Sequence, residues 1–157
     1  MTSSPRTNRA PAFPGDDRYI ACNVLVVDDD DVAIEAVLRS FRKHEVPCRT
    51  LTASDGAEAL AILRDQHPSK RLECPVLVLL DLNMPGMDGF QFLQAVRADA
   101  QLRRTVIFVL STSTRDQDRD RAYDEQVAGY MVKSAVGPQF SRLAEFVGKY
   151  ACTQQLP

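Results

Sequence analysis

The 157-residue sequence has no long hydrophobic stretch, no excess of basic residues and no paired cysteine motif. None of its apolar runs approaches the roughly 20 residues that cross a bilayer, and the N-terminus lacks the apolar core of a signal peptide. A formal net charge of −2 provides no basic footprint for nucleic acid. We therefore expect a cytoplasmic protein that binds neither membranes nor nucleic acid.

The cysteines are scattered along the chain, at Cys22, Cys48, Cys74 and Cys152. They form no CxxC pair and have no histidine at ligand spacing, which argues against a metal site built on thiolates. A cytoplasmic chain of this size does not need disulfides. We expect free thiols that are buried or partly exposed.

The composition, 45% hydrophobic and 25% charged residues, is that of an ordinary globular domain. Residues 1–18 contain three prolines and no hydrophobic periodicity, which predicts a flexible N-terminal tail. We expect one domain over residues 19–152 and a short C-terminal tail over 153–157.

Five short apolar runs alternate with five helical patterns. Strands are expected at 23–27, 47–53, 76–80, 106–110 and 129–132, and helices at 34–43, 57–63, 90–96, 115–126 and 140–150. The third and fourth runs are apolar at every position, which is typical of strands buried on both faces. Strict alternation predicts an α/β fold, a doubly wound five-stranded parallel sheet with helices on both faces.

Local signals mark the starts of four helices. A polar residue followed three positions later by Glu or Gln occurs as Asp55 with Glu58, Asp88 with Gln91, and Thr114 with Gln117. Each pair is the signature of a helix cap. Pro138 suits the first turn of the last helix.

Polar side chains follow four of the strands, at the edge where open parallel sheets bind ligands. They are Asp28 and Asp29, Asp81, Ser111 and Thr112, and Lys133. Carboxylates held together repel one another and need a cation to stay ionised. Because all the ligands are oxygens, the pattern favours a hard ion such as Mg²⁺.

Lys133 adds a positive charge suited to an anionic oxygen, and Ser111 adds a hydroxyl donor. A metal, a lysine and a hydroxyl around one carboxylate are the parts that receive a phosphoryl group, since that chemistry depends on positioning and charge neutralisation. The sequence therefore predicts Asp81 as a nucleophile that forms an acyl phosphate.

Four motifs in this order resemble the receiver domain of two-component response regulators. They are Val26-Val27-Asp28-Asp29, Asp81 to Gly89, Ser111-Thr112 and Gly129 to Lys133. Thirty residues separate Asp81 from Ser111, and 22 separate Ser111 from Lys133, as in the family. The resemblance covers residues 22–150 and implies the flavodoxin-like strand order 2-1-3-4-5.

The resemblance implies that Asp81 is the phosphoacceptor, taking a phosphoryl group from a phosphohistidine of a sensor histidine kinase. Asp29 would bind Mg²⁺ directly, Asp28 mainly through water, and Asn83 through its backbone carbonyl. Asp30 and Asp31 are interpreted instead as cap and first-turn residues of a helix.

It also implies roles for the remaining residues. Ser111 and Lys133 would bind phosphoryl oxygens, while Asn83 and Ser113 sit where the family tunes the lifetime of the phosphoryl group. Tyr130 would be a rotameric switch that reshapes the face made by the fourth helix, fifth strand and fifth helix. A strand aromatic packed into the core is the alternative interpretation of Tyr130.

One position departs from the family pattern. The family usually places proline after the lysine, whereas Ser134 follows Lys133. A cis bond there would cost about 2.5–4 kcal/mol, so we expect a trans bond. Lys-Ser here and Ser-Thr-Ser after the fourth strand resemble single-domain receivers that serve phytochrome-type kinases.

The chain ends at Pro157, soon after the last predicted helix, so we expect a stand-alone regulator that is not an enzyme. Its output would be contact with a downstream protein target or a phosphotransfer protein. Phe146 widens the apolar stripe of the last helix, which suggests a partner or homodimer contact at the face named above.

Two other classes are considered. An Asp-nucleophile phosphatase of the haloacid-dehalogenase type needs a second Asp two residues after the first, where this chain has Asn83. A receiver-like interaction module that no longer takes phosphate is the other class, and the complete set of site residues argues against it.

Overall fold

The computed structural model describes residues 22–73, 75–135, 140–153 and 155–157. The strands are β1 (Cys22–Val27), β2 (Cys48–Ala53), β3 (Val76–Leu80), β4 (Val106–Ser111) and β5 (Gly129–Val132). The α-helices are α1 (Asp31–Lys43), α2 (Gly56–Leu63), α3 (Gly89–Ala98), α4 (Asp116–Asp124) and α5 (Ser141–Thr153), with a 3-10 turn η1 (Lys133–Ala135) after β5. The predicted tail over 1–18 and the predicted helix start at Pro138 lie outside the described residues.

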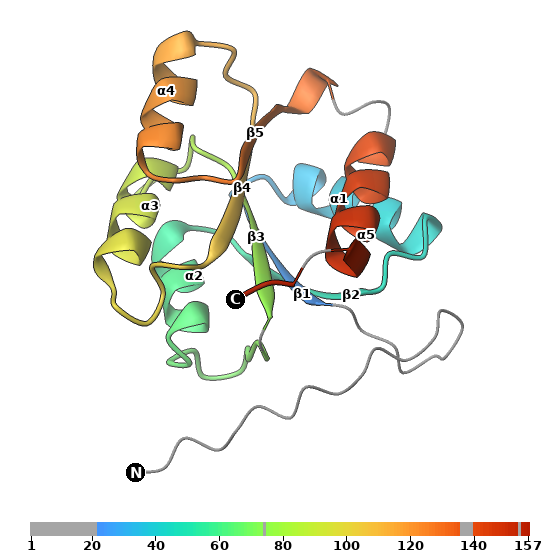
Figure 1. The fold of residues 1–157 in the computed structure, drawn as a ribbon, viewed down its shortest axis with the longest axis horizontal. Helices are drawn as coiled ribbons and strands as arrows, with labels where there is room; N and C mark the ends of the chain where they lie inside the picture. The colour runs from blue at the N-terminus through green and yellow to red at the C-terminus, as the bar shows by residue number, and fades with distance from the viewer. Residues whose placement is uncertain (1–21, 74, 136–139, 154) are drawn as a thin grey trace.

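The strands form one parallel sheet in the order β2-β1-β3-β4-β5, which confirms the predicted fold class and strand order. Val27 pairs with Ala53 on one side and with Leu80 on the other. The carboxyl ends of the first three strands therefore lie level at one edge. Helices α2, α3 and α4 cover one face of the sheet, and α1 and α5 cover the other (Figure 1).

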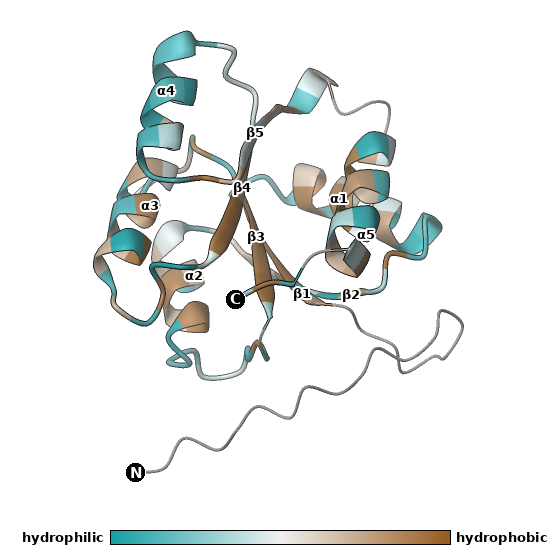
Figure 2. Cartoon of the chain, viewed as in Figure 1, coloured by the Kyte–Doolittle hydropathy of each residue, from teal (hydrophilic) through white to brown (hydrophobic). Residues whose placement is uncertain are grey.

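Side chains along each central strand alternate between two hydrophobic clusters. In β1, Leu25 and Val27 pack toward the face of α2 and α3, whereas Val24 and Val26 pack toward α1 and α5. Because both faces are covered, the strands are apolar at successive positions, and Figure 2 shows them brown along their length. Among the described residues, no helix has the length and apolar character needed to cross a membrane.

Two of the helix starts follow the predicted chemistry. The Asp30 side chain accepts hydrogen bonds from the backbone N–H groups of Val32 and Ala33, so it caps α1 as expected. Asp88 and Gln91 form a complete capping box at α3. Each cap determines where the loop before its helix ends. The loop before α1 carries Asp28 and Asp29, and the loop before α3 carries Asp81 and Asn83, all of which are predicted site residues.

The predicted cap of α4 is wrong. Arg115, not Thr114, occupies the N-cap position, and its side chain makes no capping hydrogen bond. The Ser113 hydroxyl accepts from the backbone N–H of Arg115 at 3.3 Å and donates to Oδ2 of Asp118 at 2.5 Å. Ser113, one residue before the predicted cap Thr114, thus supports the first turn, and α4 begins at Asp116.

Helix α4 is more polar than α1, α2, α3 and α5. It ends at Asp124 rather than near Gln126, which has a left-handed backbone with φ of 60°. Ala122 is its one buried residue, and the helix is mainly teal in Figure 2. The guanidinium of Arg121 lies 4.0 Å from the ring centroid of Phe90 on α3.

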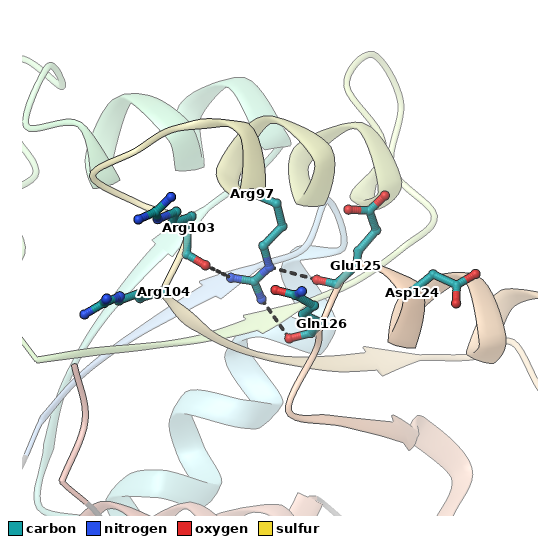
Figure 3. Close-up of a pocket in the computed structure, with 6 residues that line it drawn as sticks. All are labelled: Arg97, Arg103, Arg104, Asp124, Glu125 and Gln126. Carbon is teal, nitrogen blue, oxygen red and sulfur yellow. Dashed lines mark hydrogen bonds between the residues drawn. The ribbon is translucent and has the colours of Figure 1, made fainter.

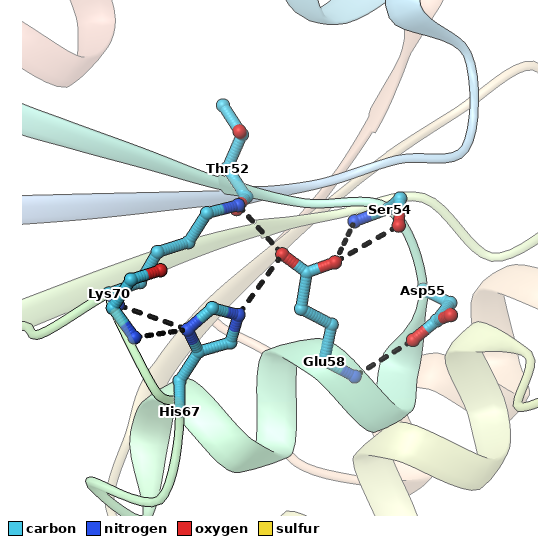
Figure 4. A network of polar contacts seen from close by, with 7 residues as sticks. Thr52, Ser54, Asp55, Glu58, His67 and Lys70 are labelled. Atoms are coloured by element: carbon cyan, nitrogen blue, oxygen red, sulfur yellow. Dashed lines mark hydrogen bonds and ion pairs between the residues drawn. The ribbon is translucent and has the colours of Figure 1, made fainter.

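The loop between α2 and β3 folds back onto the end of β2 (Figure 4). Lys70 Nζ lies 2.7 Å from both Oε1 of Glu58 and the carbonyl oxygen of Thr52. The Glu58 carboxylate also accepts from the Ser54 hydroxyl at 3.0 Å. Asp55 accepts from the Glu58 backbone N–H at 2.8 Å, so the predicted capping box at α2 is only half formed. The second half is missing because Glu58 pairs with Lys70 and Ser54 instead.

Candidate functional site

Three carboxylates meet at the carboxyl edge of the sheet. Asp28 follows β1 and Asp81 follows β3, and these strands are neighbours in the sheet. One oxygen from each of Asp28, Asp29 and Asp81 lies within 4.8 Å of the others. Asp28 and Asp81 are 5% and 7% exposed, whereas Asp29 is exposed. The structure thus brings together the three acids predicted for a metal site.

Backbone hydrogen bonds hold the two buried acids in place. The N–H of Asp28 donates to the Ala53 carbonyl at 3.0 Å, and the N–H of Asp81 donates to the Val27 carbonyl at 2.9 Å. The sheet ladder therefore continues one residue past β1 and β3. Because both carboxylates extend from this rigid frame, their separation is set by strand pairing rather than by a flexible loop.

Lys133 reaches the acids from the 3-10 turn after β5. Its Nζ donates to Oδ2 of Asp28 at 2.7 Å and lies 3.8 Å from Oδ2 of Asp81. The lysine side chain is 15% exposed. A largely buried ammonium therefore balances part of the negative charge on two buried carboxylates.

The charge on Asp81 is only partly balanced. Burial, followed by the negative charge of Asp28, raises the pKa of the Asp81 carboxyl to about 6, although Lys133 and the N–H of Asn83 act in the opposite direction. The N–H of Asn83 lies 3.4 Å from Oδ1 of Asp81. The other oxygen of Asp28 accepts from the N–H of Asp30 at 2.9 Å.

The chemistry of this cluster fits a hard divalent cation. Its three side chains offer only carboxylate oxygens, the ligands that Mg²⁺ and Mn²⁺ prefer. The exposed Asp29 leaves one side of the cluster open, and Mg²⁺ usually keeps several waters in such a site. A cation there would also relieve the repulsion between Asp28 and Asp81.

The hydroxyl residues at the end of β4 and directly after it lie at the same edge. Ser111 is fully buried and pairs in the ladder with Val132, the residue before Lys133. The Ser111 hydroxyl accepts from the N–H of Ser113 at 3.1 Å. The Tyr130 hydroxyl donates to the carbonyl of Ser113 at 3.0 Å. Hydrogen bonds through Ser113 therefore link Ser111 to Tyr130.

Sequence reasoning did not find the contact between Ser113 and Asp118. The two residues are five apart and span a loop and the first turn of α4, a separation at which helix periodicity predicts no contact. Tyr130 is half-buried and packs against the cluster between the sheet and α2, α3 and α4. It makes its hydrogen bond to the loop, so the structure links it to the site indirectly.

A cavity of about 430 Å³ lies at the opposite edge of the sheet, where α3 and α4 end (Figure 3). The Arg97 guanidinium on its wall donates to the carbonyls of Arg103, Thr105, Glu125 and Gln126. Because these carbonyls occupy its donors, Arg97 holds two loops together. The residues that line this cavity include none of the three clustered acids, so the cavity and the acidic cluster are separate.

Comparisons with known proteins agree with this geometry. The family model for the response regulator receiver domain matches residues 24–144. A probable methanogenesis regulatory protein, FilR2 of Methanothrix harundinacea, is 32% identical over 127 residues, which cover 81% of this chain and 81% of that protein.

Two solved structures are similar over most of their length. The phosphorylated cyanobacterial phytochrome response regulator RcpA is 31% identical with a TM-score of 0.74, covering 87% of this chain and 98% of that one. The Mn²⁺-bound form of response regulator Rcp1 is 26% identical with a TM-score of 0.74, covering 87% and 99%. With the strand order and the acidic edge described above, these matches show that the chain belongs to the family of response regulator receiver domains.

Proposed function

We propose that this chain is a response regulator that accepts a phosphoryl group on Asp81 and signals by protein contact. The donor is the phosphohistidine of a sensor histidine kinase, and the reaction requires Mg²⁺. The observation that carries the proposal is the position of Asp81, whose carboxylate is grouped with two further acids and faces Lys133 Nζ at 3.8 Å. This grouping supports a site in which a nucleophile, a cation and the ammonium of Lys133 would act at one point.

In the proposed reaction, a carboxylate oxygen of Asp81 attacks the phosphorus atom. The new O–P bond forms as the P–N bond to the kinase histidine breaks, and the imidazole keeps the electron pair of that bond. Asp28, Asp29 and Asp81 would hold the Mg²⁺, which supplies positive charge to the phosphoryl oxygens. Asn83 would add its backbone carbonyl.

Lys133 and Ser111 would complete the binding of the phosphoryl group. The ammonium of Lys133 is already held at the edge by Asp28 and is 15% exposed, so it can pair with a phosphoryl oxygen after little movement. The Ser111 hydroxyl accepts a hydrogen bond from Ser113 and would donate its own proton to a phosphoryl oxygen. Acting as a phosphoacceptor, the chain assists its own phosphorylation and is not an enzyme with a separate substrate.

Tyr130 would transmit the change. If Ser111 moves to donate to a phosphoryl oxygen, its contact with the Ser113 N–H is disturbed, and the Ser113 carbonyl holds the Tyr130 hydroxyl. The shift would then reach α4 through the bond from Ser113 to Asp118. These contacts support a switch that ends at the face formed by α4, β5 and α5.

The same face is proposed for contact with a downstream target, a phosphotransfer protein or a second copy of the chain. Phe146 on α5 is 38% exposed, and its ring packs edge-on against Phe108 with centroids 5.2 Å apart. The similarity to the phytochrome response regulator RcpA supports a phytochrome-type kinase as the partner. The substitution Tyr123→Glu, which places a charge at an exposed aromatic residue of α4, would test whether this face carries the contact.

The experiment is intact-mass analysis after incubation with acetyl phosphate, with and without Mg²⁺. Wild type is expected to gain one phosphoryl group only when Mg²⁺ is present. Asp81→Asn is expected to gain none, and Asp31→Asn, which removes an exposed first-turn acid, should behave as wild type. An adduct that persists in Asp81→Asn would place the chemistry at another residue.

A second arm covers dependence on a specific kinase. Beryllofluoride mimics the phosphoryl group without needing a donor, and its binding to wild type with Mg²⁺ is expected to stabilise the fold. If neither acetyl phosphate nor beryllofluoride acts on wild type, the phosphoacceptor role is wrong and an interaction module is the better interpretation.

A further inference from the structure

Two cysteines that are far apart in the sequence meet on neighbouring strands. Cys22 begins β1 and Cys48 begins the edge strand β2, and the two residues are direct partners in the parallel ladder. Their Sγ atoms lie 3.2 Å apart. Parallel partners point to the same face of a sheet, and both side chains belong to the hydrophobic cluster under α1 and α5.

The backbone geometry allows these sulfurs to be joined. Neighbouring strands lie about 4.7–4.9 Å apart, which falls within the Cα separations of about 4.4–6.8 Å that disulfides span. The two sulfurs already point toward each other, so closing the bond requires side-chain adjustment and no separation of strands.

The expectation that Cys22, Cys48 and Cys152 are free thiols is confirmed. Because Cys22 and Cys48 are in contact, these two thiols can react with each other on oxidation, which isolated thiols cannot do.

Of the two thiols, Cys48 is the more accessible to small molecules. Cys22 is 1% exposed, whereas Cys48 is half-buried and lines a surface cavity of about 320 Å³ between the end of α1 and β2. Phe41, Arg42 and Val46 form part of the cavity wall. A water occupies roughly 30 Å³, so a small hydroperoxide fits there and meets Cys48 before Cys22.

One proton is shared between the two sulfurs, and either atom can be the donor. With Cys48 as donor, the hydrogen bond lowers the pKa of the Cys22 thiol, and the same bond raises the pKa of the Cys48 thiol. The first proton therefore leaves the pair more readily than it leaves an isolated thiol. Because thiolates rather than thiols attack peroxides, this arrangement favours oxidation.

We propose that Cys22 and Cys48 form an oxidation-sensitive dithiol site, which a hydroperoxide converts into an intrachain disulfide. Once the pair has lost its first proton, the remaining proton passes to Cys22 along the hydrogen bond, in which either sulfur can be the donor. The thiolate is then on Cys48, the more exposed of the two. It attacks one peroxide oxygen, the O–O bond breaks, and the departing oxygen takes a proton to become water or an alcohol. Cys48 is then a sulfenic acid. The Cys22 sulfur gives up its proton and attacks the Cys48 sulfur, forming the S–S bond and breaking the S–O bond, and the departing hydroxide takes that proton to become water. Two thiols are oxidised by two electrons, and one peroxide is reduced.

This site is independent of the proposed phosphoacceptor chemistry. It lies at the amino ends of β1 and β2, whereas Asp28 and Asp81 lie past the carboxyl ends of β1 and β3. A failure of either proposal leaves the other unaffected. The bond would join residues that are 26 positions apart, and such a loop raises the unfolding temperature by restricting the unfolded chain.

The test treats the full chain with hydrogen peroxide, alkylates the remaining thiols and measures the intact mass, followed by peptide mapping. Wild type is expected to lose two hydrogen atoms and two alkylation sites, and to yield a joined peptide containing Cys22 and Cys48 that a reductant separates. The double variant Cys74→Ser/Cys152→Ser should form the same bond. Cys22→Ser and Cys48→Ala should each abolish the bond. If a serine at the buried position 22 disturbs folding, Cys48→Ala still tests the proposal.

The reaction is repeated in concentrated urea at the same pH as a control for the folded geometry. The bond is expected to form at least about tenfold faster in the folded chain, because the fold holds the sulfurs together. The oxidised chain should also unfold at a temperature about 5–15 °C higher. Oxidation of Cys48 to a sulfinic acid without a joined peptide would overturn the proposal, as would cross-links between chains through Cys152 alone.

Discussion

The Nζ atom of Lys133 lies 2.7 Å from Oδ2 of Asp28 but 3.8 Å from Oδ2 of Asp81. The lysine thus neutralises Asp28 more fully, while Asp81 keeps a pKa raised to about 6 by burial and by the charge of Asp28. Asp81, the proposed nucleophile, is therefore the carboxylate whose ionisation costs the fold most.

Asp81→Asn should stabilise the metal-free fold at neutral pH. The pKa of Asp81 rises from its ordinary value of 3.8 to about 6 in the fold, so the folded chain holds this proton more tightly than the unfolded chain. The associated stability is present at low pH and lost as the pH rises through about 6. The variant avoids that loss, and it should be more stable than wild type by about 1–3 kcal/mol at pH 8.

Urea unfolding in the presence of EDTA, at pH 8 and near pH 4, would measure this effect. The difference between wild type and Asp81→Asn should shrink as the pH falls toward 4, because both chains then carry a neutral group at the position. Asp31→Asn is the matched control and should change little at either pH. Equal stabilities of wild type and Asp81→Asn at pH 8 would contradict the prediction.

Mg²⁺ should stabilise the wild-type fold. A ligand that binds only the folded state adds about 1.4 kcal/mol when its free concentration is roughly ten times its Kd. Removing a ligand, as in Asp29→Asn, should weaken this response, and Asp81→Asn should weaken it too. The measurement is the unfolding temperature at increasing Mg²⁺, with NaCl at matched ionic strength as the control. An equal response to both salts would argue against a specific site.

Lys133→Met should have opposite effects on metal binding and on phosphorylation. Without the ammonium, the carboxylate of Asp28 is no longer neutralised by an ion pair with Lys133 Nζ. The affinity of the site for Mg²⁺ should therefore rise several-fold. Phosphorylation by acetyl phosphate should nevertheless slow by about 10²–10³-fold, the usual loss on removing one donor to a developing charge. Lys149→Met on α5, an exposed site, is the matched control. A variant that loses Mg²⁺ binding and phosphorylation together would show that Lys133 only supports the local structure.

The acidic edge was predictable because it depends on strand ends. All residues of β3, and all residues of β4 except the last, are apolar. This locates the end of each apolar run and the polar residue that comes directly after it. Asp81 and Ser111 were found in this way. Parallel pairing then brings such residues to one edge without any knowledge of side-chain packing.

Other features depend on tertiary contacts that a local pattern does not contain. Residues 111–114 read Ser-Thr-Ser-Thr, and the choice of Ser113 over Thr114 as support for α4 depends on its contact with Asp118. Likewise, the meeting of Cys22 and Cys48 depends on the register of β2 against β1. The apolar pattern of β2 is weak, and register is poorly specified in such a strand.

The ion pair between Glu58 and Lys70 should contribute stability only above acidic pH. Its short hydrogen bond from Lys70 lowers the pKa of Glu58 below the ordinary value of 4.5. The unfolded chain therefore binds this proton more readily, and the stability is present above about pH 4.5 and lost as the pH falls through the lower folded value. Lys70→Met should cost about 0.5–1 kcal/mol at pH 7, since the pair is partly exposed.

Urea unfolding at pH 7 and pH 3 would check this. The difference between wild type and Lys70→Met should be clear at pH 7 and small at pH 3. Arg71→Met is a suitable control, because the pair that Arg71 makes with Asp65 at 3.4 Å is exposed. A difference that persists at pH 3 would show that Lys70 acts through its bond to the Thr52 carbonyl instead.

Tyr130→Phe should separate phosphorylation from its output. The phenylalanine keeps the packing of the ring but loses the hydrogen bond to the Ser113 carbonyl, which should cost about 0.5–1.5 kcal/mol. Uptake of the phosphoryl group from acetyl phosphate should stay within about twofold of wild type, because the hydroxyl that is removed bonds to Ser113 and not to Asp81, Ser111 or Lys133.

The change should appear on α4. Amide hydrogen exchange over residues 113–124, with and without beryllofluoride, should show a difference in wild type that is much reduced in Tyr130→Phe, since the hydroxyl joins β5 to the loop that supports α4. Tyr150→Phe on α5 serves as the control and should retain the wild-type response. If Tyr130→Phe keeps the full response, the aromatic ring belongs to the core and the switch lies elsewhere, with the bond from Ser113 to Asp118 as the remaining route to α4.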